Sequence, residues 1–179
     1  MFHRSKRLLL RPVWPEDWQA IYSGMNDRDL VRNLARAPWP YRAEHAQAFA
    51  RIQQDPFAPR FLITLAQSGT VIGCIGLDPV DDGAALDVGY WIARGYRGLG
   101  YASEALFGAV ALARMMDKKR LCASFYTDNP ASGRVLQKAG FMPKPQIAMH
   151  FSLGRGEDVP TIECVLDLEE IAPEVRKAA

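Results

Sequence analysis

Hydrophobic and polar residues alternate in several short segments of the chain, a pattern typical of β-strands. Residues 67–70 (Gln-Ser-Gly-Thr) and 81–83 (Asp-Asp-Gly) separate three of these segments and carry the chemistry of turns. The region 61–92 is therefore predicted to form an antiparallel meander. The predicted strands are residues 6–13, 61–66, 71–77, 85–92, 120–127, 147–153 and 161–168.

A helical spacing of apolar residues is clearest between Ala102 and Met116, and it predicts the longest helix of the chain. Another helix begins at Asn129-Pro130 and ends near Gly140, which has the freedom to terminate it in the left-handed conformation. Two more helices are predicted, one opening at residues 14–17 and one over 42–54. Residues 30–41 contain two prolines and are predicted to be a loop with short helical pieces.

The order of these elements predicts the fold class. A meander followed by strand, helix, strand, helix and strand gives a mixed sheet rather than a fully parallel one. We expect an α+β protein with about seven strands, mostly antiparallel, flanked by about four helices. The length of 179 residues fits one domain covering 1–179.

Composition narrows the classes of partner. The chain is 49% hydrophobic and 23% charged, with a net charge of +2, which indicates a folded core and gives no reason to expect nucleic-acid binding. Cys74, Cys122 and Cys164 are too widely spaced to indicate a disulfide framework or a metal site. No apolar run is long enough for a membrane span or a signal peptide, so we expect a cytoplasmic protein without membrane attachment.

The segment 94–102 (Arg-Gly-Tyr-Arg-Gly-Leu-Gly-Tyr-Ala) joins a predicted strand to the longest helix. Glycines allow close backbone approach, and the free amides of a helix N-terminus attract anions, so the segment suits a phosphate or pyrophosphate. A P-loop is excluded because Tyr101 and Ala102 stand where it needs Lys and Ser/Thr. The glycine order also differs from that of the dinucleotide fingerprint, which leaves a nucleotide-dependent redox domain as a remote alternative.

The run from Arg97 to Ala102 resembles the Arg/Gln-x-x-Gly-x-Gly/Ala signature of the GNAT N-acetyltransferases. Residues 88–92 are similar to the strand that precedes this loop in the family. Residues 129–132 (Asn-Pro-Ala-Ser) and 138–141 (Lys-Ala-Gly-Phe) resemble its second signature. The opening residues 6–12 are similar to the Rim-type branch, which acetylates ribosomal-protein N-termini. The resemblance extends from about residue 6 to about residue 168.

This resemblance implies a GNAT fold and a direct transfer of the acetyl group of acetyl-CoA, a cosubstrate, to a primary amine. The acceptor would be a protein N-terminal α-amine or a small-molecule amine, and no metal is implied. Many relatives are monomers or homodimers. The residues implied to bind the cosubstrate are Trp91, Ile92, Arg97, Gly98, Leu99, Gly100, Tyr101, Ala102 and Asn129.

The resemblance also suggests how the thioester is activated. Backbone amides near Ile92 would bind the oxyanion, and we expect a bulge at Gly89 that frees them. Ser132 is the candidate for stabilising the leaving thiolate, because Leu136 stands where many GNAT enzymes have a tyrosine acid. Asn129 precedes a proline, so it is equally well explained as a helix cap.

The general base is harder to assign from sequence. Asp87 is the first choice because it lies on the strand beside the expected thioester, while Glu104, His150 and Glu163 are alternatives. Glu104 also fits an acid in the first turn of a helix, and His150 fits a structural histidine.

The loop 32–41 is where we expect the acceptor to enter. Trp39 and Tyr41 are its candidate contacts, although aromatic residues are core residues first. The alternative function for the whole chain is a catalytically inactive sensor that binds coenzyme A. Measured turnover with any amine distinguishes the two.

Overall fold

The computed structural model describes residues 1–80 and 85–168, so the turn predicted at 81–83 lies outside the described residues. The strands are β1 (His3–Arg4), β2 (Leu8–Pro12), β3 (Arg60–Leu65), β4 (Val71–Val80), β5 (Ala85–Ile92), β6 (Arg120–Tyr126), β7 (Met142–Ser152) and β8 (Glu157–Asp167). The helices are α1 (Trp18–Met25), α2 (Arg28–Val31), α3 (Ala43–Ala50), α4 (Tyr101–Met115) and α5 (Pro130–Lys138), with short 3-10 turns at η1 (Pro15–Asp17) and η2 (Arg94–Tyr96).

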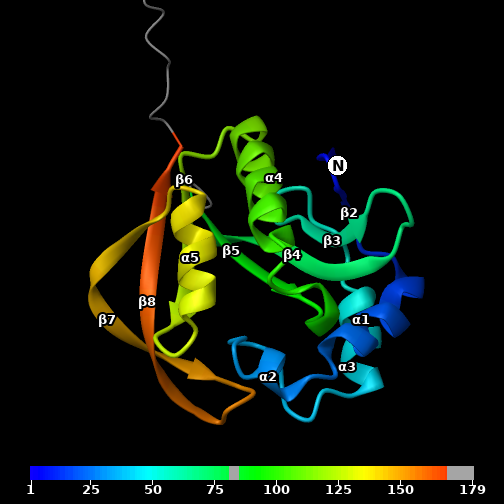
Figure 1. Cartoon of the computed structure of the whole chain (residues 1–179), viewed down its shortest axis with the longest axis horizontal. Coiled ribbons are helices and arrows are strands. Elements are labelled where there is room, and N and C mark those ends of the chain that lie inside the picture. Colours follow the sequence, from blue (N-terminus) through cyan, green and yellow to red (C-terminus); the bar gives the residue numbers. More distant parts are fainter. Residues whose placement is uncertain (81–84, 169–179) are drawn as a thin grey trace, which may run out of the picture.

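The eight strands in the described residues form one sheet in the order β1-β2-β3-β4-β5-β6-β8-β7 (Figure 1). Within the described ranges, β5 and β6 are the only parallel neighbours, and every other pair is antiparallel. The parallel pair is connected through α4, as a parallel connection requires a crossover. The predicted mixed, mostly antiparallel sheet is confirmed.

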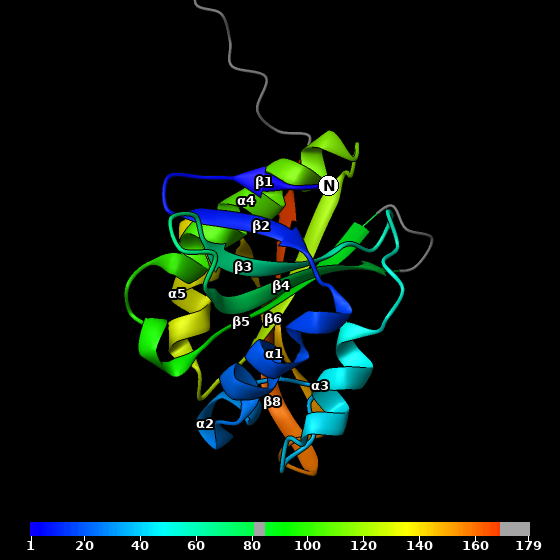
Figure 2. The ribbon, with the colours of Figure 1, turned by 90° about the vertical axis from the view of Figure 1, so that its right-hand side faces the viewer.

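Helices cover the two faces of the sheet separately. One hydrophobic cluster joins α4 and α5 to the strands and includes Phe61 and Ile75. The other joins α1–α3 to the same strands and includes Leu62 and Cys74. Residues of opposite parity therefore point to opposite faces, as in any strand that is buried on both sides. Figures 1 and 2 show α1–α3 gathered on one side of the sheet, away from α4 and α5.

The elements that the sequence missed are short or interrupted. β1 has two residues, and α2 has four, beginning at Arg28, two residues before the region 30–41 that is predicted as a loop with short helical pieces. β7 starts at Met142, five residues before the predicted start, because Pro143 and Pro145 obscure the alternation there. The pairing of β7 with β8 is irregular over that same stretch, between Pro143 and Ile147.

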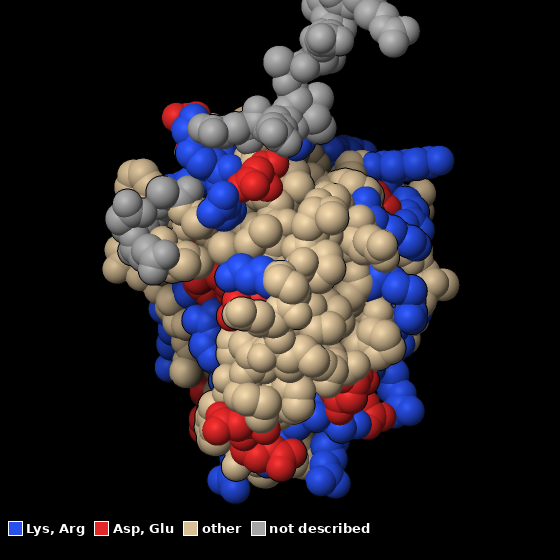
Figure 3. Space-filling view, turned by 90° about the vertical axis from the view of Figure 1, so that its left-hand side faces the viewer, with Lys and Arg blue, Asp and Glu red and all other residues tan. Residues whose placement is uncertain are grey.

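Edge strand β7 carries an exposed apolar face. Ile147, Met149 and Phe151 share this face and are each more than half exposed. Figure 3 shows the side of the molecule that carries β7 with few charged side chains across its centre. In 1–80 and 85–168, no helix combines the length and the apolar content that crossing a membrane requires.

The corner between β2 and α1 is held by a partly buried ion pair. The guanidinium of Arg11 donates two hydrogen bonds to the Asp17 carboxylate, at 2.8 and 2.7 Å, and the Trp14 amide donates a third at 2.8 Å. Burial alone would raise the pKa of Asp17, but the hydrogen bonds from Arg11 and Trp14 and the charge of Arg11 outweigh it and lower that pKa.

We predict that Asp17→Asn lowers the free energy of unfolding at pH 7 by about 1–3 kcal/mol, because it leaves Arg11 without its charged partner. The lowered pKa in the folded state means that the stabilisation is complete above the ordinary value of 3.8 and is lost as the pH falls through the folded-state pKa. Urea unfolding at pH 7 and in acid measures this. The exposed Asp158 provides the control Asp158→Asn, which should change little. An equal effect of the two variants would contradict the prediction.

Candidate functional site

The two parallel strands at the centre of the sheet separate soon after they meet. β5 pairs with β6 only from Ala85 to Asp87, opposite Arg120 to Cys122. Beyond Asp87, β5 stays paired with β4 on its other side up to Ile92. One edge of the second half of β5 is therefore without a strand partner.

The backbone groups on that free edge follow from the alternation of hydrogen bonds. The Ala93 amide donates to the Ile72 carbonyl on β4 at 2.8 Å, so alternate residues of β5 direct their backbone groups toward β4 and the residues between them direct theirs away. The Val88 amide still completes the parallel ladder with Cys122 on β6, so the amides that face the divergence are those of Tyr90 and Ile92. The register between β4 and β5 is continuous, with Gly76 opposite Gly89, so the predicted bulge at Gly89 is wrong. The amides are freed by the divergence of β6 instead.

The glycine loop follows directly. Gly98 and Gly100 have φ of +75° and +82°, a conformation that strongly favours glycine. Gly100 caps the N-terminus of α4, whose first amides have no acceptor inside the helix. A Cβ added to Gly95 or Gly98 would meet no described atom within 4 Å, so the loop surface is open to a ligand. The loop and the first turn of α4 also include the backbone of Leu99, Tyr101 and Ala102.

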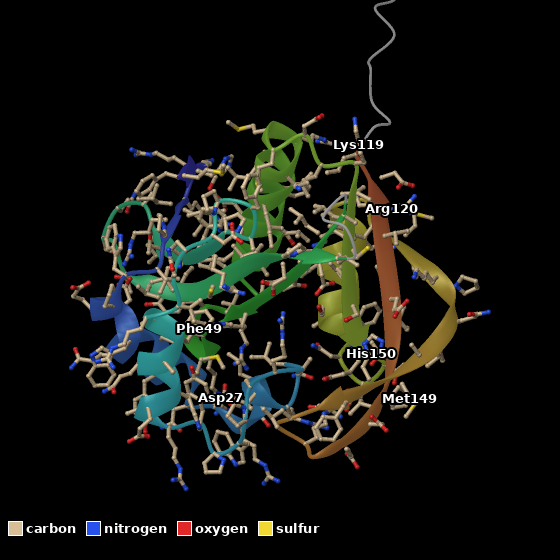
Figure 4. The ribbon with its side chains drawn as sticks, turned by 180° about the vertical axis from the view of Figure 1, so that it is seen from behind. Asp27, Phe49, Lys119, Arg120, Met149 and His150 are labelled. Atoms are coloured by element: carbon tan, nitrogen blue, oxygen red, sulfur yellow. The ribbon has the colours of Figure 1, made fainter. Side chains whose placement is uncertain are left out.

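The side chain of Arg97 braces the loop from within. Its Nε donates to the Ile92 carbonyl at 2.9 Å, and its other end donates to Asp27 at 2.8 Å. Asp27 lies between α1 and α2 (Figure 4). The guanidinium of Arg97 therefore fixes the loop against β5, while its backbone remains part of the loop surface.

A second brace, from Arg7, was missed by sequence reasoning. Arg7 donates to the Leu99 carbonyl at 3.0 Å and to Glu104 at 2.6 Å, and its guanidinium lies 4.5 Å from the centre of the Tyr101 ring. Glu104 also accepts from Ser5 at 2.7 Å. Burial would raise the pKa of Glu104, but the bonds from Ser5 and Arg7 lower it, so Glu104 anchors the N-terminal strand rather than acting as a base.

The start of α5 brings a serine to the other side of the divergence. The Asn129 side chain accepts from the Ser132 amide at 3.4 Å, so Asn129 caps the helix. Tyr90, on β5, reaches α5 and its hydroxyl lies 2.8 Å from Ser132 Oγ. Burial raises the pKa of Tyr90 to about 12. Sequence reasoning missed this tyrosine, whose partner lies 42 residues away.

Asp87 lies on the face of β5 opposite to that of Tyr90, toward α1–α3. Burial raises its pKa, the nearby charge of Arg36 opposes that effect, and Asp78, its partner on β4, adds to it. The neighbouring surface is open, because Gly89 is exposed although it lies in a central strand and a Cβ there would meet no described atom within 4 Å.

Two more ionisable groups from the sequence analysis lie on the neighbouring strands. His150 is labelled on β7 in Figure 4. It lies 3.1 Å from the Glu163 carboxylate on β8, and Lys144 lies 2.9 Å from the same carboxylate. The hydrogen bond from Lys144 lowers the pKa of Glu163, which is therefore an ion-pair partner at neutral pH. Their charges influence Asp87 across β6.

The aromatic candidates divide between core and surface. The Trp91 ring packs in the α1–α3 cluster, where a Cβ on Gly24 would lie 2.7 Å from it. The Trp91 amide faces β4. The structure thus gives Trp91 a packing role and does not place it along the divergence. Tyr41 is 7% exposed in the same cluster, so its prediction as an acceptor contact is corrected to a core role. Trp39 is 36% exposed on the loop and stays a prediction.

The arrangement defines a class of protein, one that binds an extended ligand with an anionic end. A left-handed glycine loop opens onto a helix N-terminus and continues into a row of unpaired strand amides, so one extended ligand with an anionic end fits both. Nothing in 1–80 or 85–168 groups three or more His, Cys, Asp or Glu side chains as a metal site.

Comparison with known families agrees with this class. Residues 7–142 match the family model of the acetyltransferase (GNAT) domain. Because the match covers most of the chain, the protein belongs to the GNAT acetyltransferase family.

Individual relatives are distant in sequence. A Bacillus subtilis protein named as the uncharacterized N-acetyltransferase YnaD is 28% identical over 137 residues, which are 76% of this chain and 79% of that protein. A GNAT-family acetyltransferase from Bacillus anthracis superposes with a TM-score of 0.85 at 22% identity, covering 95% of this chain and all of the other. RimL, a ribosomal L7/L12 α-N-protein acetyltransferase in complex with coenzyme A, gives 0.78 at 20% identity, covering 93% and 98%.

We predict that Asp87→Asn raises the free energy of unfolding at pH 7. Because burial raises the folded-state pKa of Asp87, the unmodified protein loses stability as the pH rises from the ordinary value of 3.8 through the folded-state value. Asparagine carries no such penalty, and the difference should disappear below about pH 4. Urea titrations across this range, with Asp158→Asn as the control, measure it. Destabilisation by Asp87→Asn at pH 7 would show that the fold stabilises the charge.

Proposed function

We propose that this protein transfers the acetyl group of acetyl-CoA to a primary amine. The observation that carries the proposal is the divergence of β5 and β6 just before the glycine loop and α4, which leaves the amides of Tyr90 and Ile92 without a partner strand. RimL, a neighbour in fold, is described with coenzyme A bound, which supports the same ligand here.

The loop residues fit the anionic part of this cosubstrate. The backbone of Gly98, Leu99, Gly100, Tyr101 and Ala102 would hold the pyrophosphate at the positive end of the α4 dipole. Arg97 and Arg7 would keep that backbone in place through the bonds that they donate to Ile92 and Leu99. When bound, acetyl-CoA supplies an activated acyl thioester.

The strand amides would bind the other end of the cosubstrate. A thioester oxygen that develops negative charge is stabilised by amides that are already fixed in direction. The amides of Tyr90 and Ile92 are fixed because alternate residues of the same strand are paired with β4. Asn129 would lie beside the pantetheine arm while it caps α5.

Asp87 would take the proton that the attacking amine loses. Its burial raises its pKa, which makes it a stronger base than an exposed aspartate once it is ionised. It shares the face of β5 with the open surface at Gly89, where an acceptor could approach. As the new C–N bond forms and the C–S bond breaks, the electron pair leaves with sulfur, and Ser132 would stabilise that thiolate by a hydrogen bond.

The acceptor is a protein N-terminal amine or a small-molecule amine. The Rim-type resemblance and the RimL neighbour support the first. The open surface beside Asp87 is compatible with both, and loop 32–41, with Trp39, would border it. We further propose that the protein works in the cytoplasm, as its composition suggests.

We predict that Gly100→Asp weakens acetyl-CoA binding by about 10- to 1,000-fold, because its carboxylate would repel the pyrophosphate. The matched control is Gly69→Asp at the β3–β4 turn, where φ is +71° and a Cβ meets no described atom within 4 Å. Both positions have a left-handed φ, so the control carries a similar backbone strain, and a difference in calorimetric affinity reports the contact with the ligand. Absence of acetyl-CoA binding by the unmodified protein would refute the proposed cosubstrate.

We also predict that Asp87→Asn lowers kcat by about 100-fold or more while leaving acetyl-CoA affinity close to unchanged, because it removes a proton acceptor on the acceptor face. Release of free thiol in the presence of a panel of amines and N-terminal peptides measures turnover. Asp158→Asn serves as the control. Tight acetyl-CoA binding without turnover on any amine would favour the sensor function instead.

A further inference from the structure

Tyr90 is the one hydroxyl-bearing side chain of β5, and it spans the divergence of the parallel strands to reach α5. Its hydroxyl lies 2.8 Å from Ser132 Oγ and 3.4 Å from the Ser132 carbonyl oxygen. The ring is half-buried against the α4–α5 cluster, so it holds the hydroxyl in one place. Ser132 therefore has a fixed partner on one side of its oxygen.

The direction of this hydrogen bond decides what Ser132 can do. A serine hydroxyl has one hydrogen to donate and two lone pairs to accept. If Ser132 donated to Tyr90, its only hydrogen would be engaged and a thiolate nearby would meet lone pairs. If Tyr90 donates to Ser132, the serine hydrogen stays available for sulfur.

The phenol of Tyr90 has a hydrogen to donate in this bond. Burial raises the pKa of Tyr90 to about 12, so the phenol keeps its proton at neutral pH. The ionisable group whose charge would act on Tyr90 is the Cys164 thiol on β8. Burial raises the pKa of this thiol too, so it stays neutral as well. Ser132 also lies in the first turn of α5, where the helix dipole favours an anion.

We propose that Tyr90 is a positioning residue: it donates its phenolic hydrogen to Ser132 Oγ and so directs the serine hydrogen toward the sulfur of coenzyme A. The inference rests on the proposed function. The tyrosine reaches Ser132 from β5. One turn further along α5, the side chain is the buried Leu136, which has no hydroxyl to offer.

The chemical step needs no net proton transfer from either hydroxyl. The amine nitrogen forms the new bond to the acetyl carbon, the C–S bond breaks, and the sulfur keeps the electron pair. The amine proton passes to Asp87 and then to solvent. Ser132 stabilises the thiolate by a hydrogen bond, and the thiolate takes its proton from solvent, so the product is coenzyme A in its thiol form.

The test uses coenzyme A and desulfo-coenzyme A, which lacks the thiol, titrated by calorimetry into the full chain between pH 6.5 and 9.5. A free thiol has a pKa of about 8.5. We expect the affinity for coenzyme A, relative to the desulfo compound, to rise about tenfold across this range, because the oriented serine favours the thiolate. Taking the ratio removes effects of other protein groups that titrate.

Tyr90→Phe should remove most of that pH-dependent gain and lower kcat about tenfold, with little change in affinity for the desulfo compound. In a Ser132→Ala background the same substitution should have no further effect on either quantity, because the group through which it acts is gone. Tyr22→Phe, in the α1–α3 cluster, is the matched control and should behave like the unmodified protein.

The outcomes separate this inference from the function on which it rests. If turnover occurs but coenzyme A and its desulfo analogue show the same pH dependence, the function stands and the role of Tyr90 is overturned. Equal losses from Tyr90→Phe with and without Ser132 would also overturn it. If the unmodified protein neither binds coenzyme A nor acetylates an amine, both fail together.

Discussion

The separation of two parallel strands is the constraint on which the site depends. β5 and β6 share three residue pairs and then part, while β5 stays paired with β4 along its whole length. An unpaired backbone edge in the interior of a sheet is costly unless another molecule satisfies it. The glycine loop, the first turn of α4 and the start of α5 are all arranged around this edge. The fold thus leaves backbone groups of a central strand available to a ligand.

Much of this fold could be predicted from local pattern. β5 was predicted with its observed bounds, and α4 within one residue at each end, because both combine clear periodicity with clear boundaries. β1 and the bounds of α2 could not be predicted, since two and four residues show no period. β1 is held by pairing with β2, which is a tertiary contact. The early part of β7 was missed because its prolines resemble a loop.

The site divides in the same way. The glycine loop and the capped start of α5 are contiguous in sequence, so their motifs could be recognised. The pairs Tyr90–Ser132 and Arg7–Glu104 join residues 42 and 97 positions apart, and no local sequence motif indicates either contact. Aromatic side chains were ambiguous for a different reason. Trp91 and Tyr41 are as suitable for a core as for a ligand surface, and only their packing in the α1–α3 cluster decides between the two.

Gly89 has an evolutionary consequence. At Gly73, on the neighbouring strand, a Cβ would come within 2.2 Å of the Trp91 carbonyl oxygen, so the fold alone excludes every other residue. Gly89 has an ordinary backbone and open space around it, and the fold tolerates a side chain there. Selection for glycine at position 89 would then come from the molecule that approaches Asp87. Descendants that gained a side chain at this position would keep the fold and change the range of molecules that can approach Asp87.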